Sequence, residues 1–378
     1  MNAQEVKNRI SEDFHHFHSH PELSYQEFKT TAKIKEELQS QGIEILPLAL
    51  ETGCVAQLGQ GERCVALRCD IDALPVQEET SLAYKSQIKG VMHACGHDFH
   101  TAIMLGTAFL LKACEDQLKG RVRIVFQPAE EAPGGAKKIL ESGALNGVEA
   151  IYGIHTINDF KPGTLAIKEG ATHAAVDRFS ITFKGKGTHA AHPEQGIDTL
   201  VIASQFVNAA QTIVSRNSNP FDSNLLSITH FEAGNTWNVV PETAFLEGTI
   251  RTMNQACREM VKKRLVELAK GIAASFGACA EVQWIFGLPA MQNSKVLSDF
   301  ARDLAKRDGF ETAIPPSSLG GEDFALYEEQ LPGAFVQIGT GPSLPNHNPR
   351  FTADEQALFP AAQFMAHLAK QYLAEFKK

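Results

Sequence analysis

The sequence predicts an α/β protein. A larger domain, built on a mixed and mostly parallel sheet with helices on both faces, is interrupted by a smaller α+β domain of ferredoxin-like topology. Short apolar runs alternate with helical segments early in the chain and again at its end, which is typical of βαβ units. Between these parts the order becomes β-α-β-β-α-β, the pattern of an antiparallel sheet covered by two helices. The length of 378 residues also favours two domains, at a typical size of about 150 residues each.

The larger domain begins with helices and then alternates strands with helices. Ile10, Phe14 and Phe17 recur at a helical spacing and share one face of a first helix. The next expected elements are a helix over residues 30–38, strands over 53–58 and 64–69, a helix over 101–114, a strand over 122–126, a helix over 135–142 and a strand over 150–154.

The inserted domain is marked by strands that alternate polar and apolar residues. Its expected elements are a strand over residues 178–184, a helix over 198–215, strands over 225–232 and 242–252, a helix over 254–276 and a strand over 280–286. A strand over 335–338 and a helix over 357–376 then return to the first sheet. The predicted domains are therefore residues 1–176 and 290–378 for the larger one, and residues 177–289 for the insertion.

The overall composition argues against several classes of function. The net charge of −9 and the pI near 5.9 disfavour binding to nucleic acid or to an anionic membrane. No apolar stretch approaches the ~18 residues of a membrane span, and the N-terminus lacks the apolar core of a signal peptide. Seven scattered cysteines fit reduced core thiols better than disulfides. We therefore expect a cytoplasmic protein that acts on a small molecule or a peptide.

Polar side chains follow several of the predicted strands. Ligands of open α/β sheets collect beyond the carboxyl ends of the strands, and adjacent carboxylates at the end of a buried strand need a positive partner. The candidates at these strand ends are Asp70, Asp72, Glu130, Glu131, His155 and His347. This set of carboxylates and imidazoles points to a metal-assisted hydrolase.

The segment Cys95-Gly96-His97-Asp98 adds a thiolate and an imidazole at the mouth of a helix. By itself, a Cys-x-His pair is more often a core thiol with a capping histidine. However, Gly96 permits tight wrapping of the backbone between two ligands, and Asp98 is placed to orient an imidazole. Together with the glutamate pair, the segment predicts a metal site.

Each candidate also has a simpler interpretation. Glu130 and Glu131 could be a solvated loop pair, although the turn at residues 133–135 favours close packing. His155 could be a core histidine, and His347 an exposed loop residue. Because successive side chains of an extended strand point to opposite sides, an irregular turn is needed for both glutamates to reach one site. The histidines at positions 15, 16, 18 and 20 fall on a helix and are left out of the site.

Further motifs extend the pattern along nearly the whole chain. They lie at residues 18–27, 68–75, 93–97, 127–131, 153–155, 187–191, 238–241, 248–251 and 320–323. In this order they resemble the M20 metallopeptidases, and within them the N-acyl-amino-acid amidohydrolases that include hippurate hydrolase, auxin-conjugate hydrolases and N-acetyl-diaminopimelate deacetylase. The resemblance implies that the inserted domain is a lid and dimerisation domain.

The resemblance also implies a site for two divalent metal ions. Manganese or zinc is expected, with cobalt or nickel as alternatives. The thiolate leaves the choice among these ions open, because it favours softer ions than a carboxylate does. The wider family has His-x-Asp where this chain has Asp70-Ile71-Asp72, and an aspartate where it has Cys95. Both departures suit this subfamily. The implied metal ligands are Cys95, as the bridge, with His97, Glu131, His155 and His347.

The catalytic set implied by the resemblance is Glu130, Asp72 and His189. A metal lowers the pKa of bound water toward ~7, and Glu130 takes the proton of that water and passes it to the leaving amine. Asp72 orients a ligand, and His189 meets the negative charge of the intermediate. In relatives this histidine often belongs to a partner subunit, which implies a homodimer. The simpler interpretation of His189 is a capping residue.

Asn238, Arg251 and Gly320 are the implied substrate-binding residues. An arginine binds a carboxylate through two parallel hydrogen bonds, which suits the α-carboxylate of an N-acyl-L-amino acid. Arg251 could instead be a solvated edge charge, and Gly320 part of a plain turn. The favoured function is hydrolysis of the amide bond of N-acyl-L-amino acids. The alternatives are a metallo-dipeptidase or carboxypeptidase acting on small peptides and, less favoured because Glu130 is present, a non-catalytic metal- or ligand-binding relative.

Overall fold

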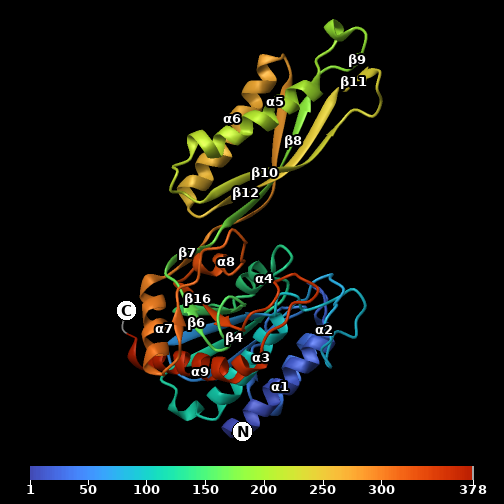
Figure 1. Ribbon diagram of the computed structural model, residues 1–378. Coiled ribbons are helices and arrows are strands. Elements are labelled where there is room, and N and C mark those ends of the chain that lie inside the picture. The colour runs from blue at the N-terminus through green and yellow to red at the C-terminus, as the bar shows by residue number, and fades with distance from the viewer. Residues whose placement is uncertain (377–378) are drawn as a thin grey trace. The chain divides into compact units, whose positions relative to one another are not determined.

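The computed structural model describes residues 1–376, and the chain divides into two compact units. The first unit comprises Met1–Gly170, Gln292–Pro316 and Leu326–Lys378, and the second comprises Ala171–Met291 and Ser317–Ala325. In Figure 1 the first unit holds both the blue start and the red end of the chain, so the second unit is an insertion. Two short strands, β7 (Gly170–His173) and β14 (Met291–Asn293), lie where the chain passes between the units.

The first unit is built on an eight-stranded sheet. Its strands are β1 (Glu44–Ile45), β2 (Cys54–Gly59), β3 (Cys64–Asp70), β4 (Arg121–Gln127), β5 (Ala150–Ile157), β6 (Leu165–Ile167), β15 (Thr312–Ala313) and β16 (Gly333–Gly339), and their order is β1-β2-β4-β3-β5-β16-β6-β15. The central pairs from β4 to β16 are parallel, as is the pair β6–β15. The pairs β1–β2, β2–β4 and β16–β6 are antiparallel. A mixed sheet with a parallel centre is therefore confirmed.

Helices cover both faces of this sheet. They are α1 (Ala3–Ser19), α2 (Phe28–Ser40), α3 (His97–Lys112), α4 (Gly135–Glu141), α7 (Lys295–Arg307), α8 (Ala325–Glu328) and α9 (Leu358–Glu375) (Figure 1). Successive residues of β4 show the two faces, because alternate side chains of a strand point to opposite sides. Phe126 belongs to the apolar core that includes residues of α1, α3, α7 and α9. Gln127 instead accepts a hydrogen bond from the hydroxyl of Tyr327 in α8, at 2.8 Å.

Two elements near the candidate site differ from the predicted ones. Helix α3 begins at His97, about one turn earlier than expected, directly after Gly96 in a left-handed conformation with φ of +84°. Strand β5 continues to Ile157 because its parallel pairing with β16 extends past His155, which lies opposite Gln337. The prediction that His155 follows the end of its strand was therefore wrong.

The second unit has the predicted order β-α-β-β-α-β. Its main elements are β8 (Ala175–Lys184), α5 (Thr199–Thr212), β10 (Asn224–Ala233), β12 (Thr243–Thr252), α6 (Gln255–Ser275) and β13 (Cys279–Leu288). The four strands form an antiparallel sheet in the order β10-β12-β8-β13. A second, two-stranded sheet joins β9 (Thr188–His189) to β11 (Val239–Val240), and it was not predicted.

The core of the second unit lies between its four-stranded sheet and its two helices (Figure 1). Phe179, Ile181 and Phe183 alternate along β8 and are all fully buried in this core. On β8 the buried carboxylate of Asp177 accepts two hydrogen bonds from Arg258 of α6, at 2.7 and 2.9 Å. This bidentate ion pair links α6 to the four-stranded sheet.

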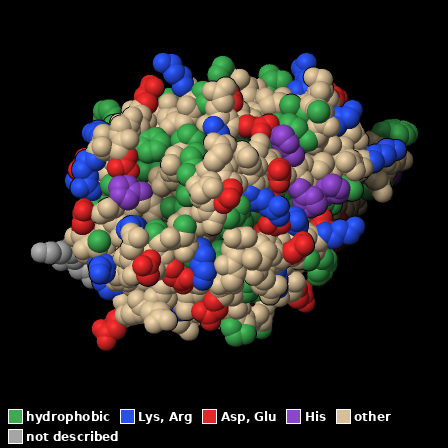
Figure 2. Space-filling model, turned by 90° about the horizontal axis from the view of Figure 1, so that it is seen from below, with side chains coloured by type: hydrophobic (Ala, Val, Ile, Leu, Met, Phe, Trp, Pro, Cys, Tyr) green, Lys and Arg blue, Asp and Glu red, His purple; other side chains and the backbone are tan. Residues whose placement is uncertain are grey.

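Charged side chains of both signs lie on the surface. Figure 2 shows acidic and basic side chains interspersed over one face of the molecule. Among residues 1–376, no helix combines the length and the apolar character needed to cross a bilayer.

Candidate metal centre

Side chains from four separate segments of the first unit bring their donor atoms together. Cys95 precedes α3, His97 opens that helix, His155 lies in β5, Glu131 follows β4, and His347 lies in the loop after β16. The Sγ atom of Cys95 lies 3.5 Å from Nε2 of His155. Nε2 of His347 lies 3.1 Å from Oε1 of Glu131, which is 4.0 Å from Nε2 of His97. The structure thus gathers the five residues that the sequence predicted as ligands.

The donor atoms form overlapping groups. Within one group, the donors of Cys95, His97 and His155 all lie within 4.8 Å of one another. Within another, the same holds for Cys95, Glu131 and His347. Cys95 belongs to both groups, so its thiolate would be within reach of both ions if each group held one. Glu130 joins His97 and Glu131 in a third group, so both glutamates face the same site.

The chemistry of these residues fits a pair of divalent ions. Nε2 of His97 is buried and, within residues 1–376, has no hydrogen-bond partner. Burial opposes ionisation of Cys95, but the imidazoles of His155, His347 and His97 lower the pKa of its thiol to about 6. A thiolate, three imidazoles and a carboxylate are ligands that zinc and similar ions prefer. The residues therefore fit the predicted dinuclear site.

Asp72 connects the ligands to one another. Its Oδ1 lies 3.2 Å from Nδ1 of His97 and accepts from the amide of Glu130 at 3.1 Å, and its Oδ2 accepts from the amide of Glu131 at 3.0 Å. Burial opposes ionisation, but the hydrogen bond with His97 lowers the pKa of Asp72 below its ordinary value. A proton on Nδ1 of His97 leaves Nε2 with its lone pair toward the site. Asp72 thus fixes both the tautomer of a ligand and the turn of the glutamate pair.

The turn after β4 brings both glutamates to one side. Ala129 has a φ of +52°, in the left-handed region that residues other than glycine rarely adopt. This single reversal breaks the extended alternation and supplies the irregular turn that the sequence required. A side chain at Gly135 would come within 2.1 Å of the carbonyl oxygen of Pro128, so the following helix can pack closely against the turn only with glycine there.

Asp70 is fully buried and contacts the site indirectly, through His100. Its Oδ1 lies 2.6 Å from Nδ1 of His100, and its Oδ2 accepts from Arg68 at 2.8 Å. Nε2 of His100 in turn accepts from the backbone amide of Thr156, next to the ligand His155, at 2.8 Å. His100 was not predicted as a site residue, although its position three residues after His97 places both on one face of α3.

Asp98 contacts a histidine outside the ligand set. Its Oδ2 lies 2.6 Å from Nδ1 of His18, and Nε2 of His18 lies 3.2 Å from Oε1 of Glu78. All three side chains are buried. Burial favours the neutral imidazole, but the two carboxylates raise the pKa of His18 to about 10. A buried cation thus anchors α1 to the start of α3.

Replacing His18 by asparagine should lower the free energy of unfolding by about 3 to 5 kcal/mol, because two buried carboxylates lose their cation. The folded-state pKa of about 10 exceeds the ordinary value of 6.5. The contribution is therefore complete below pH 6.5 and lost as the pH rises through 10. Urea unfolding of the wild type and of His18→Asn measures this loss: the difference between their free energies of unfolding should be large at about pH 6 and much smaller at about pH 9.5. The control is His15→Asn. His15 lies on the same helix as His18, and its loss removes only a partly exposed pair with Glu355, so it should cost at most about 1 kcal/mol.

In the second unit, His189 and Asn238 lie side by side. Strand β9 places His189 opposite Val239, the neighbour of Asn238. The amide of Ala191 donates to Nδ1 of His189 at 3.0 Å, so the neutral ring carries its proton on Nε2. The hydroxyl of Thr236 donates to Oδ1 of Asn238 at 3.1 Å, which leaves the amide nitrogen of Asn238 to donate elsewhere.

Arg251 and the glycine pair form a second grouping in this unit. Nη1 of Arg251 lies 3.8 Å from the point that a Cβ on Gly321 would occupy. Burial alone lowers the pKa of Arg251 from its ordinary value. A half-buried guanidinium beside glycine backbone suits the capture of an anionic group. The amide of Gly320 donates to the hydroxyl of Ser318 at 2.9 Å, so this glycine also belongs to a local turn.

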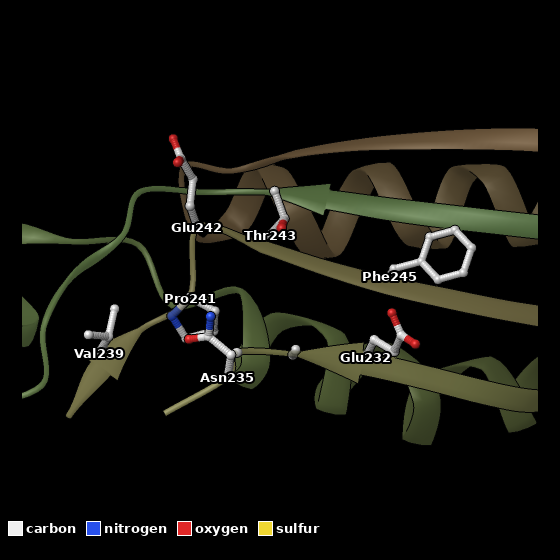
Figure 3. A pocket seen from close by; sticks show the side chains of 9 residues that line it. Glu232, Asn235, Val239, Pro241, Glu242, Thr243 and Phe245 are labelled. Atoms are coloured by element: carbon white, nitrogen blue, oxygen red, sulfur yellow. The ribbon is translucent and has the colours of Figure 1, made fainter. Parts of the chain in front are cut away.

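A pocket of about 400 Å³ lies beside the two-stranded sheet formed by β9 and β11. Figure 3 shows Glu232, Asn235, Val239, Pro241 and Phe245 among its lining residues. None of the predicted site residues lines the pocket. It therefore adds no member to the catalytic set.

The chain is similar to known proteins along most of its length. The pattern of peptidase family M20/M25/M40 matches residues 66–371. An N-acetyl-L-cysteine deacetylase of Bacillus subtilis (strain 168) is 47% identical over 360 residues, which cover 95% of this chain and 86% of that protein. IAA-amino acid hydrolase ILR1-like 4 of Arabidopsis thaliana is 37% identical over 95% of this chain and 84% of that protein. The crystal structure of a dinuclear metal binding peptidase of the M20 family from Bacillus subtilis has a TM-score of 0.90 at 44% identity, covering 99% of this chain and 100% of the other.

Proposed function

Because the chain belongs to peptidase family M20/M25/M40, and is a metal-dependent amidohydrolase of that family, we propose that it hydrolyses the amide bond of N-acyl-L-amino acids. The products are a carboxylic acid and a free amino acid. The observation that supports this most directly is the turn at Ala129, which sets a second carboxylate, Glu130, beside the proposed ligand Glu131. Related proteins named for N-acetylcysteine and for amino-acid conjugates of IAA support the substrate class.

Glu130 is the proposed general acid and base of this reaction. Two divalent ions, held by Cys95, His97, Glu131, His155 and His347, supply an acidified water and polarise the scissile carbonyl when bound. Glu130 accepts a proton from the attacking water and passes it to the nitrogen of the leaving amine, so that the C–N bond breaks with a neutral amino group. Asp72 holds the amide of Glu130, which keeps its carboxylate on the side of the ligands.

Residues of the second unit are proposed to bind the substrate. His189 presents Nε2–H, a donor for the oxyanion of the tetrahedral intermediate. Asn238, next to it, offers a second donor, and the backbone at Gly320 permits close approach of a ligand. Arg251 is proposed to hold the α-carboxylate of the amino acid.

Replacing Arg251 by alanine should raise KM by about ten- to a hundredfold and leave kcat within a few-fold, because a charged hydrogen bond worth about 1.5 to 3 kcal/mol is lost from ground and transition state alike. Steady-state kinetics with an N-acyl amino acid and with its C-terminal amide measure the effect. The amide should bind both proteins equally weakly. Arg178→Ala removes an exposed arginine paired with Glu247 on the same sheet and should leave KM unchanged. Equal KM values for the Arg251 variant and the wild type would contradict the assignment.

The proposal extends to the metals, the assembly and the location. Manganese or zinc is the proposed pair of ions, with cobalt or nickel as alternatives; thiolate and imidazole ligands suit zinc, and a carboxylate ligand suits manganese. A homodimer is supported by Trp237, with 91% of its surface exposed, and Val239, with 48%, beside His189. A cytoplasmic location is supported by the five cysteine thiols buried in the protein, which suit a reducing compartment.

A substrate panel tests the function as a whole. The protein is reconstituted with each of the four metals and assayed against N-acetyl, N-benzoyl and longer N-acyl amino acids, with unblocked dipeptides as the rival class. Release of free amino acid from the acylated series, above that from dipeptides, is the expected result. Hydrolysis confined to dipeptides, or full activity of metal-free protein, would overturn the proposal.

A further inference from the structure

The segment that joins α1 to α2 braces the turn of the glutamate pair, and we propose that its buried residue Glu27 is a positioning residue for hydrolysis. This inference rests on the proposed function, because it concerns how Glu130 is held. Glu27 belongs to the motif at residues 18–27, to which neither the ligand set nor the substrate contacts assign a role.

Glu27 reaches the turn through its carboxylate. The side chain is fully buried, and Oε1 accepts a hydrogen bond from the backbone amide of Ala129 at 2.8 Å. Ala129 is the residue with a φ of +52°, and Glu130 follows it directly. A left-handed conformation costs an alanine roughly 1 kcal/mol or more, so it persists only where surrounding contacts impose it. The bond from Glu27 is a contact of this kind.

Neighbouring residues of the same segment hold the two ends of the turn. The hydroxyl of Ser24 donates to Oδ2 of Asp72 at 2.6 Å, and Asp72 receives the amides of Glu130 and Glu131. The hydroxyl of Tyr25 donates to the carbonyl oxygen of Pro133, also at 2.6 Å. Three anchors from residues 24–27 therefore hold the turn: Glu27 before the glutamates, Ser24 at the glutamates through Asp72, and Tyr25 after them. Of the three, Glu27 acts on the residue whose backbone reversal turns Glu130 toward the site.

The role requires an acceptor rather than a charge. Burial raises the pKa of Glu27, yet a carboxylic acid and a carboxylate both offer an oxygen to the Ala129 amide. Glutamine keeps this oxygen at the same reach, whereas leucine has a similar volume and no acceptor. Aspartate keeps the acceptor but retracts it by one methylene. These three replacements separate hydrogen bonding from charge and from packing.

The test compares Glu27→Leu, Glu27→Asp and Glu27→Gln in the full-length, metal-loaded protein. Glu27→Leu should lower kcat on the order of ten- to a hundredfold with KM within a few-fold, because displacement of a catalytic group by about 1 Å costs that much. Glu27→Asp should show a smaller loss, and Glu27→Gln should retain most of the activity. The matched control is Glu22→Leu. Glu22 lies in the same segment as Glu27, and its carboxylate accepts a hydrogen bond from the backbone amide of Thr30 in α2, at 2.8 Å. This bond does not involve the turn of the glutamate pair.

Amide hydrogen exchange gives a second readout that needs no substrate. In metal-free protein, the backbone amides of residues 127–131 should exchange faster in Glu27→Leu and Glu27→Asp than in the wild type. Their exchange rates in Glu27→Gln and Glu22→Leu should equal those of the wild type. Equal exchange in all proteins, an equal loss of kcat in Glu22→Leu, or failure of Glu27→Gln to restore kcat would each overturn the role of Glu27. If Glu27→Leu does not fold, Glu27→Asp and Glu27→Gln still decide. A wild type inactive on every N-acyl amino acid would instead overturn the proposed function, and the exchange data would still judge Glu27.

Discussion

Glu130→Ala is expected to lower kcat by about 10²- to 10⁴-fold while both metal ions stay bound. The carboxylate faces the site within the group formed with His97 and Glu131, and it lies outside the two groups that share Cys95. In the proposed assignment, its removal takes away the acceptor of the water's proton without taking away one of the five ligands. Turnover at saturating substrate and elemental analysis of the same sample measure the two effects.

The neighbouring residue provides the contrast. Glu131→Gln should lose metal as well as activity, because the carboxylate of Glu131 belongs to the group formed with Cys95 and His347. Two adjacent carboxylates should thus give two different defects. Turnover retained in Glu130→Ala, or equal loss of metal in both variants, would remove Glu130 from the role of base.

Cys95→Ala is expected to deplete the bound metal. The thiol is shared by the two groups of donors, and its pKa of about 6 makes it largely thiolate at neutral pH. The loss of affinity should exceed the roughly 10- to 100-fold that removal of an outer support costs a metal site. Elemental analysis after dialysis, and metal titration of the stripped protein, measure the loss.

Cys54→Ala is the matched control for this variant. Cys54 is also a buried thiol, but burial raises its pKa to about 12, so it is a neutral core side chain. Its removal should leave metal content unchanged and cost only the stability of a small core contact. A Cys95 variant that keeps its full complement of metal would refute the shared-ligand role.

Much of the site was predictable because its residues follow recognisable strands. The apolar run of residues 122–126 forms β4, and the two glutamates come directly after its turn, as expected. Cys95 and His97 lie at the mouth of α3 because Gly96 reverses the backbone between them. In these cases the local sequence specifies both the element and the point where it ends.

The conformation of Ala129 could not be predicted in the same way. Nothing in an alanine indicates a positive φ, and the contact that imposes it comes from Glu27, 102 positions earlier in the sequence. The same holds for His347, whose φ of +69° follows from its place in a loop and whose amide bonds to the carbonyl oxygen of Ala94 at 2.7 Å. The partnership of His18 with Asp98 was equally invisible, because a helical histidine shows no sign of its buried partner. Long-range contacts decided each of these features.

The inserted unit separates His347 from the other four ligands along the chain. During synthesis on the ribosome, Cys95, His97, Glu131 and His155 emerge early, and His347 only after the whole insertion and β16 have been made. Until that point the nascent polypeptide lacks one of the five proposed ligands, so the complete set of donors exists only when the chain is nearly finished.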